Sequence, residues 1–169
     1  MRIRTTVTVL AALAGTLAFT ASPAGADTSP KQTRTGEHCI ADLGNGKIAC
    51  ADSEQQARQL AGVSADSVNG ARLYDATGFG GATFTITVDA PCTAVYEHEY
   101  IYPDLGRVGW NNRAGSVRTY NSCDVKLYDP VVPPSDPDLT MGSTWIDEAT
   151  NLGNIGSGWN NRAGSLRLS

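Results

Sequence analysis

One ten-residue segment occurs twice in this chain, and this internal repeat restricts the fold more than any other feature. Residues 109–118 read Gly-Trp-Asn-Asn-Arg-Ala-Gly-Ser-Val-Arg, and residues 158–167 differ only in having Leu where the first copy has Val. Leu-Tyr-Asp also occurs twice, at 73–75 and at 127–129. Two copies are too few for a solenoid, which generally needs about three or more repeats. The repeat therefore predicts a pseudo-twofold domain over residues 71–169, in which each copy supplies half of a sandwich.

The sequence between the repeated segments is typical of an all-β domain. Short runs rich in Thr, Val, Tyr and Ile alternate with turn residues, and they predict strands at 83–88, 96–102, 117–120 and 125–128. The first of these alternates polar and apolar residues, which predicts a half-buried strand. Several short strands separated by turn signals favour a β-sandwich or a barrel.

A smaller unit is expected in front of the repeats, at residues 37–70. Asn45-Gly46 predicts a hairpin over 38–50 with a type I′ turn, which needs positive φ at both central residues. Ser53 and Gln56 fit a capping box and Gly62 fits a helix stop, so one short surface helix is predicted between them. Residues 27–36 are polar and without period, and they are interpreted as a flexible leader.

The first 26 residues have the organisation of a secretory signal peptide. Arg2 and Arg4 form a basic start, residues 7–19 are apolar, and Ala24-Gly25-Ala26 fits a cleavage site. An apolar segment of 13 residues is short for a membrane span, so the prediction is export rather than anchoring. Removing two arginines changes the formal net charge from −4 to −6. A balanced, mildly acidic chain argues against nucleic-acid binding.

All four cysteines lie after the predicted cleavage site, and an even number in an exported chain indicates two disulfides. Four cysteines allow three connectivities. The predicted hairpin would bring Cys39 and Cys50 together, so Cys39–Cys50 with Cys92–Cys123 is the favoured pairing. A four-cysteine metal site is disfavoured because the sequence has no Cys-x-x-Cys pair.

The repeat resembles the Greek-key motif of the βγ-crystallin family. That motif has an aromatic corner with a required glycine, here Tyr74, Phe79 and Gly81, and later Asn/Asp-Asn/Asp-x-x-Ser/Thr-Ser, here residues 111–116. Gly81 would supply a positive φ, and the Ser116 hydroxyl would hold the folded hairpin by hydrogen bonds. The second copy lacks the corner and has Pro-Val-Val-Pro-Pro from residue 130, so its first hairpin is expected to be irregular.

The resemblance implies a mainly β fold, in which two Greek-key motifs form a βγ-crystallin-like sandwich preceded by a disulfide hairpin and a short helix. With its signal peptide, the whole chain also resembles the secreted bacterial βγ-crystallins of the metalloproteinase-inhibitor-like and killer-toxin-like groups.

Calcium-binding members of the family imply a further site. They build each site from both motifs. The second Asn/Asp of one motif gives a side-chain oxygen, and the other motif gives the carbonyl of its third position and the Ser/Thr hydroxyl of its fifth. Carried over by position, these ligands are the side chains of Asn112 and Asn161 and the carbonyls of Arg113 and Arg162. The fifth positions are Gly115 and Gly164, which have no hydroxyl, and asparagine brings no charge.

Because Ca²⁺ prefers 6–8 oxygens and binds more weakly as ligand charge falls, the implied calcium site is weak. Serine in place of Gly115 and Gly164 would be expected to strengthen it. The alternative is that Asn-Asn-x-x-Gly-Ser only stabilises a turn.

Enzymatic activity is not expected. The chain has two histidines, His38 and His98, and neither Gly-x-Ser-x-Gly nor His-Glu-x-x-His. Glu97 and Glu99 lie on one face of a predicted strand, which is typical of a solvated acidic edge. Trp110 and Trp159 either anchor a partner or pack beneath their loops, and packing is favoured.

The sequence thus predicts a secreted, extracellular, monomeric, non-enzymatic binding protein, of which the favoured kind is an inhibitor of an extracellular (metallo)protease. Its partner would be a secreted protease or a cell-surface target, with no nucleic acid and no membrane span. The alternatives are a calcium-binding structural module of the cell exterior and an antimicrobial, killer-toxin-like protein.

Overall fold

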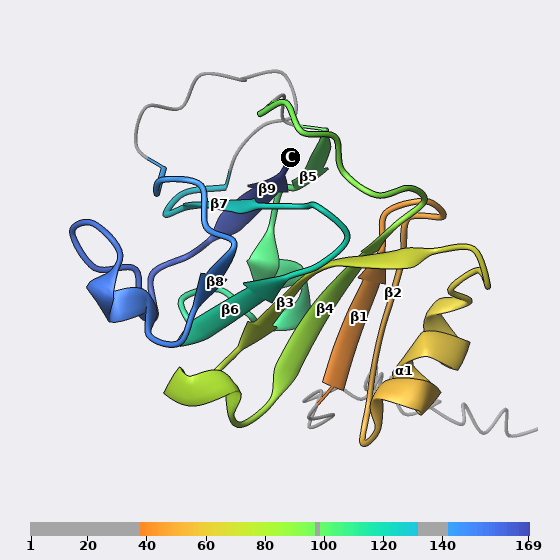
Figure 1. The fold of residues 1–169 in the computed structure, drawn as a ribbon. Coiled ribbons are helices and arrows are strands. Elements are labelled where there is room, and N and C mark those ends of the chain that lie inside the picture. The colour runs from red at the N-terminus through yellow and green to blue at the C-terminus, as the bar shows by residue number, and fades with distance from the viewer. Residues whose placement is uncertain (1–37, 97–98, 132–141) are drawn as a thin grey trace, which may run out of the picture. The chain divides into compact units, whose positions relative to one another are not determined.

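Two antiparallel-rich sheets enclose the main hydrophobic core (Figure 1). The computed structural model describes residues 38–96, 99–131 and 142–169, all within the compact unit Gln32–Ser169. The larger sheet has the order β2-β1-β4-β3-β6-β8, and the smaller has the order β5-β9-β7. The strands of the larger sheet are β1 (His38–Asp42), β2 (Lys47–Ala51), β3 (Val68–Tyr74), β4 (Thr83–Val88), β6 (Ser116–Thr119) and β8 (Glu148–Ala149). Those of the smaller sheet are β5 (Tyr100–Tyr102), β7 (Val125–Tyr128) and β9 (Ser165–Leu168).

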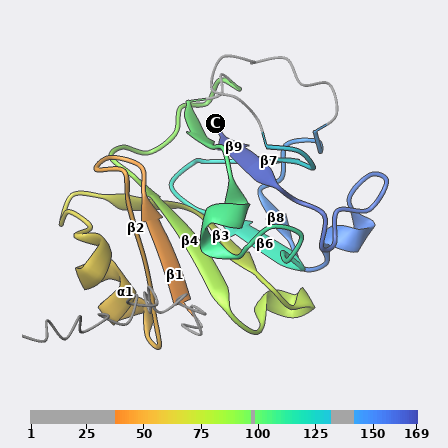
Figure 2. The same ribbon diagram turned by 180° about the vertical axis from the view of Figure 1, so that it is seen from behind.

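The two copies of the repeat each place one strand in the other copy's sheet. The first copy contributes β3, β4 and β6 to the larger sheet and β5 to the smaller one. The second contributes β7 and β9 to the smaller sheet and β8 to the larger one. Both views of the ribbon show this exchange (Figures 1 and 2). The predicted mainly β class is confirmed. The described residues do not complete a second Greek key, because the chain between β7 and β8 includes residues 132–141, which are outside them.

The core lies between the inner faces of the two sheets. Leu73 and Phe84 from the larger sheet and Leu127 and Leu166 from the smaller one are fully buried in the same cluster. Burial of each such side chain stabilises the fold by about 1.5–3 kcal/mol. Exchange of strands therefore produces one shared core rather than one core for each copy.

Strand β4 is buried on both faces, so the predicted half-buried strand is wrong in that respect. Phe84, Ile86 and Val88 face the main core, as their alternation predicts. On the opposite face, Thr85 accepts a hydrogen bond from Arg72 Nε at 2.9 Å, and Thr83 bonds to His38 Nδ1 at 2.8 Å. These partners cover the threonine face, which a single-strand pattern cannot reveal.

The predicted N-terminal hairpin is confirmed, with β1 and β2 in antiparallel register and Cys39 opposite Cys50. The prediction of a type I′ turn is wrong. Four residues, 43–46, separate the last pair, and only Gly46 among them has a positive φ (71°). Asp42 organises this longer turn by accepting from the Gly44 N–H and the Asn45 amide, each at 3.0 Å.

The hairpin continues the larger sheet, because β1 pairs in parallel with β4 over residues 38–42 and 83–87. Helix α1 (Glu54–Ala61) also matches its prediction. The Ser53 hydroxyl accepts from the Gln56 N–H at 3.3 Å, and Gly62 ends the helix in the left-handed region at φ 61°. Buried Ala57 and Ala61 pack against the hairpin, which fixes α1 beside β1 and β2 (Figure 1).

Several predictions fall partly or wholly outside the described residues. The signal peptide (1–26), the leader (27–36), Glu97 and His98 are among them. Of the predicted strand at 96–102, the structure shows β5 at its C-terminal end. No helix within the described ranges has the length and apolar character needed to cross a membrane.

Candidate functional site

The repeated segments form two equivalent loops, here called loop 1 (110–116) and loop 2 (159–165). Each follows a short 3-10 helix, η2 (Leu105–Val108) or η3 (Leu152–Asn154). The residue before each helix, Asp104 or Asn151, caps it by accepting from the backbone N–H two residues later, at 2.8 Å in both cases. The sequence therefore contains an extension of the repeat, Asp/Asn-Leu-Gly, that the sequence analysis missed.

The two loops bond to each other in a reciprocal pattern. The Asn112 N–H donates to the Ala163 carbonyl at 2.9 Å, and the Asn161 N–H donates to the Ala114 carbonyl at 2.8 Å. Asn112 and Asn161 have positive φ values of 55° and 54°, a conformation that asparagine tolerates better than most residues. These residues, which the sequence analysis proposed as ligands from different copies, therefore do lie in adjoining loops.

Each loop is also tied to the first hairpin of its own copy. The Ser116 hydroxyl donates to the Ala76 carbonyl at 2.6 Å and accepts from the Phe79 N–H at 3.0 Å, as predicted. Ser165 donates to the Pro130 carbonyl at 2.6 Å in the second copy. The aromatic corner of the first copy is present as well, because the rings of Tyr74 and Phe79 meet edge to face with centroids 5.4 Å apart.

Glycine is required at the predicted corner position. Gly81 has a φ of 78°, and a Cβ there would lie 1.9 Å from the Asp75 carboxylate. Phe79 also has a positive φ, of 62°, which a bulky residue rarely adopts. The hydrogen bond that the Phe79 N–H donates to the Ser116 hydroxyl and the ring contact with Tyr74 hold it in this conformation.

An arginine in each loop pairs with the aspartate of the repeated Leu-Tyr-Asp. Arg113 Nη2 lies 3.0 Å from Asp75 Oδ2, and Arg162 Nε lies 2.9 Å from Asp129 Oδ2. Each guanidinium also lies 4.7 Å from the ring centroid of the loop tryptophan, Trp110 or Trp159. Repetition of both Leu-Tyr-Asp and Arg in the sequence was the signal that could have revealed these pairs.

The tryptophans themselves are buried, 1% exposed for Trp110 and 3% for Trp159. Trp110 stacks on Phe84 with ring centroids 5.8 Å apart. The favoured interpretation, packing beneath the loops, is therefore the correct one, and neither ring is an exposed anchor for a partner.

The loops offer a poor donor set for calcium. The carbonyls of Ala114 and Ala163 accept hydrogen bonds from the opposite loop, and those of Gly115 and Gly164 accept from Leu152 and Leu105. The nearby carboxylates, Asp75 and Asp129, are bound to guanidinium groups. These carbonyls and carboxylates are thus already engaged, which leaves a poor donor set for an ion that needs 6–8 oxygens with net negative charge. The side chains of Asn112 and Asn161 and the carbonyls of Arg113 and Arg162 stay predicted ligands.

The expectation that serine could restore a ligand is wrong on geometric grounds. A Cβ at Gly115 would lie 2.8 Å from the Asp75 carbonyl oxygen, and one at Gly164 would lie 2.1 Å from the Asp129 carbonyl oxygen. Both obstacles are backbone atoms. Any side chain at these positions must therefore push the loop away from its hairpin.

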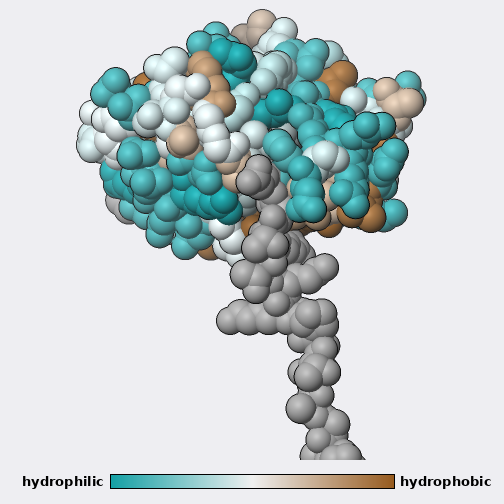
Figure 3. Space-filling model, turned by 90° about the horizontal axis from the view of Figure 1, so that it is seen from below, coloured by the Kyte–Doolittle hydropathy of each residue, from teal (hydrophilic) through white to brown (hydrophobic). Residues whose placement is uncertain are grey.

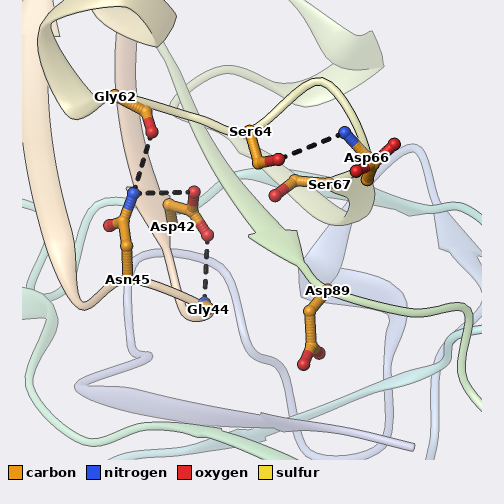
Figure 4. A pocket seen from close by; sticks show the side chains of 8 residues that line it. All are labelled: Asp42, Gly44, Asn45, Gly62, Ser64, Asp66, Ser67 and Asp89. Atoms are coloured by element: carbon orange, nitrogen blue, oxygen red, sulfur yellow. Dashed lines mark hydrogen bonds between the residues drawn. The ribbon is translucent and has the colours of Figure 1, made fainter.

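A separate hollow lies between the β1–β2 turn, the segment after α1 and the end of β4 (Figure 4). Its volume is about 340 Å³, and its lining residues are Asp42, Gly44, Asn45, Gly62, Ser64, Asp66, Ser67 and Asp89. The Asp42 carboxylate is buried and already accepts two hydrogen bonds, and Asp89 accepts one from the Tyr100 hydroxyl at 2.9 Å. Within the described residues, no three His, Cys, Asp or Glu side chains converge as a metal site.

The most distinctive exposed segment is 89–96, here called the pinned loop. Both predicted disulfides are present, and one of them joins Cys92 in this loop to Cys123. Val95 and Tyr96 are 55% and 63% exposed, respectively. Exposed apolar side chains are otherwise scattered, and Figure 3 shows a largely hydrophilic face with small, separate hydrophobic patches.

Four sets of contacts fix the pinned loop. The Cys92 N–H donates to the Asn121 carbonyl at 3.1 Å, and the Thr93 N–H donates to the Glu99 carboxylate at 2.9 Å. The Val95 carbonyl accepts from the Ser169 hydroxyl at 2.8 Å. The Tyr96 ring stacks on Trp145 at 5.4 Å, and a hydrogen bond to Asp124 raises the pKa of its hydroxyl.

Comparison with known proteins gives matches to solved structures. No family model and no curated protein matches the chain. The N-terminal domain of protein S is similar at 20% identity over 60% of this chain and 96% of that one, with a TM-score of 0.41. A βγ-crystallin from Ciona intestinalis is similar at 16% identity over 59% and 98%, with a TM-score of 0.41. A βγ-crystallin domain from Flavobacterium johnsoniae is similar at 16% identity over 59% and 92%, with a TM-score of 0.38.

Proposed function

We propose that this protein is a secreted, non-enzymatic inhibitor of an extracellular protease, and that it docks through the pinned loop (89–96). The observation that carries the proposal is the combination of exposure and restraint in that loop. Val95 and Tyr96 present apolar surface to solvent, while Cys92 is covalently tied to the β6–β7 connection at Cys123.

Restraint favours binding because a segment that is already ordered loses little conformational entropy when it docks. Exposed tyrosine and branched aliphatic side chains on such a segment suit a protease cleft, which binds substrates as extended chains with side chains in pockets. Hot-spot energy at interfaces is concentrated in a few side chains, and tyrosine is among the enriched types.

The same contacts support inhibition over simple cleavage. A cut within residues 93–95 would leave the N-terminal side held by the Cys92–Cys123 disulfide and the C-terminal side held by the stacking of Tyr96 on Trp145. The new ends would therefore stay close together, which favours resynthesis of the bond over release. Two disulfides agree with an oxidising, extracellular environment.

The test is a titration of the oxidised protein, without residues 1–26, against a secreted metalloprotease such as thermolysin and a serine protease such as subtilisin. We expect loss of activity of one of them at micromolar or lower inhibitor. Val95→Lys should weaken inhibition at least about tenfold, because it puts a charge into an apolar contact. Full activity of both proteases in excess inhibitor would contradict the proposal.

Leu60 provides the matched control. It lies on α1, away from the pinned loop, and its exposed fraction of 61% is close to those of Val95 and Tyr96. Leu60→Lys should leave the inhibition constant unchanged. Equal effects of the two lysine variants would show that the pinned loop is not the docking segment.

A further inference from the structure

Each loop carries one arginine that is ion-paired within its own copy of the repeat. Arg113 and Arg162 are equivalent in the repeat, and each bonds to an aspartate of its own copy, Asp75 or Asp129. Each guanidinium is also placed over a buried indole ring, at 4.7 Å from the centroid in both copies. The same three-part arrangement of carboxylate, guanidinium and indole has therefore formed twice.

In this arrangement the negative charge of each aspartate is neutralised by an arginine of the same chain. One carboxylate and one guanidinium give each loop a net charge near zero. A divalent cation brought to the same carboxylate would lie close to the guanidinium and would be repelled by it, since unit charges about 4 Å apart interact by several kcal/mol near a protein surface.

We propose that Arg113 and Arg162 are built-in cations, which fasten each loop to its own hairpin and make the domain independent of calcium. The Arg side chain suits this task because it is always charged, bonds to a carboxylate in a fixed geometry and stacks on aromatic rings. The proposal does not depend on protease inhibition.

A consequence is that calcium sensitivity should appear when the guanidinium is removed. Arg113→Ala frees the Asp75 carboxylate at the contact between loop 1 and its hairpin, where the backbones of Asp75 and Gly115 approach closely. A free carboxylate with a few neutral oxygens is a weak calcium site, of about millimolar affinity. Added Ca²⁺ should then recover part of the lost stability.

The experiment measures thermal melting and calorimetric binding with about 10 mM CaCl₂ or with EDTA. The unmodified protein should show the same melting temperature in both, within about 1 °C, and no binding heat. Arg113→Ala should lower the melting temperature by about 3–5 °C, and Ca²⁺ should restore at least half of the loss. In the Asp75→Asn/Arg113→Ala double variant, which has no free carboxylate, Ca²⁺ should have no effect.

Arg162→Ala repeats the test at the more exposed ion pair. If Arg113→Ala does not fold, the Arg162→Ala variant still tests the proposal. Two results would overturn the proposal. One is a rise in the melting temperature of the unmodified protein with Ca²⁺, because a cation would then bind beside the arginine. The other is a fall in both alanine variants with no response to Ca²⁺, because the arginines would then act by packing on the tryptophans and not by charge.

Discussion

Loop 1 and loop 2 have the same bonding scheme although they stand in different surroundings. Loop 1 leads into β6, which lies next to the edge strand β8 of a six-stranded sheet, whereas loop 2 leads into β9 at the centre of a three-stranded one. Both cross-bond through asparagine N–H groups, both place an arginine over a tryptophan, and both end in a serine that bonds to a hairpin carbonyl. Contacts that persist in two environments are specified by the repeated residues themselves.

The differences between the copies lie in how closely each loop approaches its hairpin and how exposed its ion pair is. The space for a Cβ is smaller at Gly164 than at Gly115, with the nearest backbone oxygen at 2.1 Å and 2.8 Å, respectively. The Asp129 side chain is 47% exposed, and that of Asp75 is 27% exposed. Loop 2 is therefore the tighter of the two sterically, while its ion pair is the more solvated.

The largest expected effect is at the two glycines. Gly164→Ala should destabilise the fold by about 3 kcal/mol or more, and Gly115→Ala by about 1–3 kcal/mol, because the new methyl group must displace backbone. The measurement is the free energy of unfolding in urea. Gly80→Ala is the control, since its Cβ would make an ordinary 3.7 Å contact at a φ of −100°, and it should change stability by less than about 0.5 kcal/mol. Equal losses at Gly115 and Gly164 would contradict the difference in clearance.

A smaller loss is expected at the two serines. Ser116→Ala and Ser165→Ala should each destabilise by about 1–2 kcal/mol, because each leaves a hairpin carbonyl without its hydroxyl donor. Urea unfolding again gives the values. The exposed Ser157, which bonds only to Arg162 Nη1 at 3.2 Å in the described residues, is the control, and Ser157→Ala should be close to neutral. A neutral Ser116→Ala would mean that the hairpin holds its shape without the hydroxyl.

The smallest effect is expected at the two aspartates. Asp75→Asn should cost about 1 kcal/mol and Asp129→Asn about 0.5 kcal/mol or less, because the more solvated pair is screened more strongly. Both losses should shrink when the salt concentration is raised to about 1 M, which shortens the range of the attraction. Thermal melts at two salt concentrations distinguish this from a packing effect, which salt would leave unchanged. A larger loss for Asp129→Asn would reverse the comparison.

Local features of the fold were predictable from the sequence because their causes are local. Ser53 caps the start of helix α1 and Gly62 ends it. A turn between Cys39 and Cys50 places the two cysteines opposite each other in the hairpin. The function of Ser116 was predictable too, but only through the family pattern that the repeat resembles.

Features that depend on distant partners were not predictable in the same way. The threonine face of β4 looks solvent-facing in the sequence, yet Arg72 and His38 cover it. The lack of space for a side chain at Gly115 arises from the backbone at Asp75, 40 residues earlier in the chain. The pairing of Arg113 with Asp75 has the same character, so the sequence analysis left open where the arginines point.

The parallel pairing of β1 with β4 has a consequence for self-association. Without the hairpin, β4 would be an edge strand with a free row of N–H and C=O groups and many β-branched residues, which is the kind of edge that recruits other chains. The hairpin moves the boundary of the sheet to β2, which begins with Lys47, has its register fixed by a disulfide and lies beside a helix. The segment in front of the repeats therefore covers a strand edge that the duplicated β domain would otherwise offer to other chains.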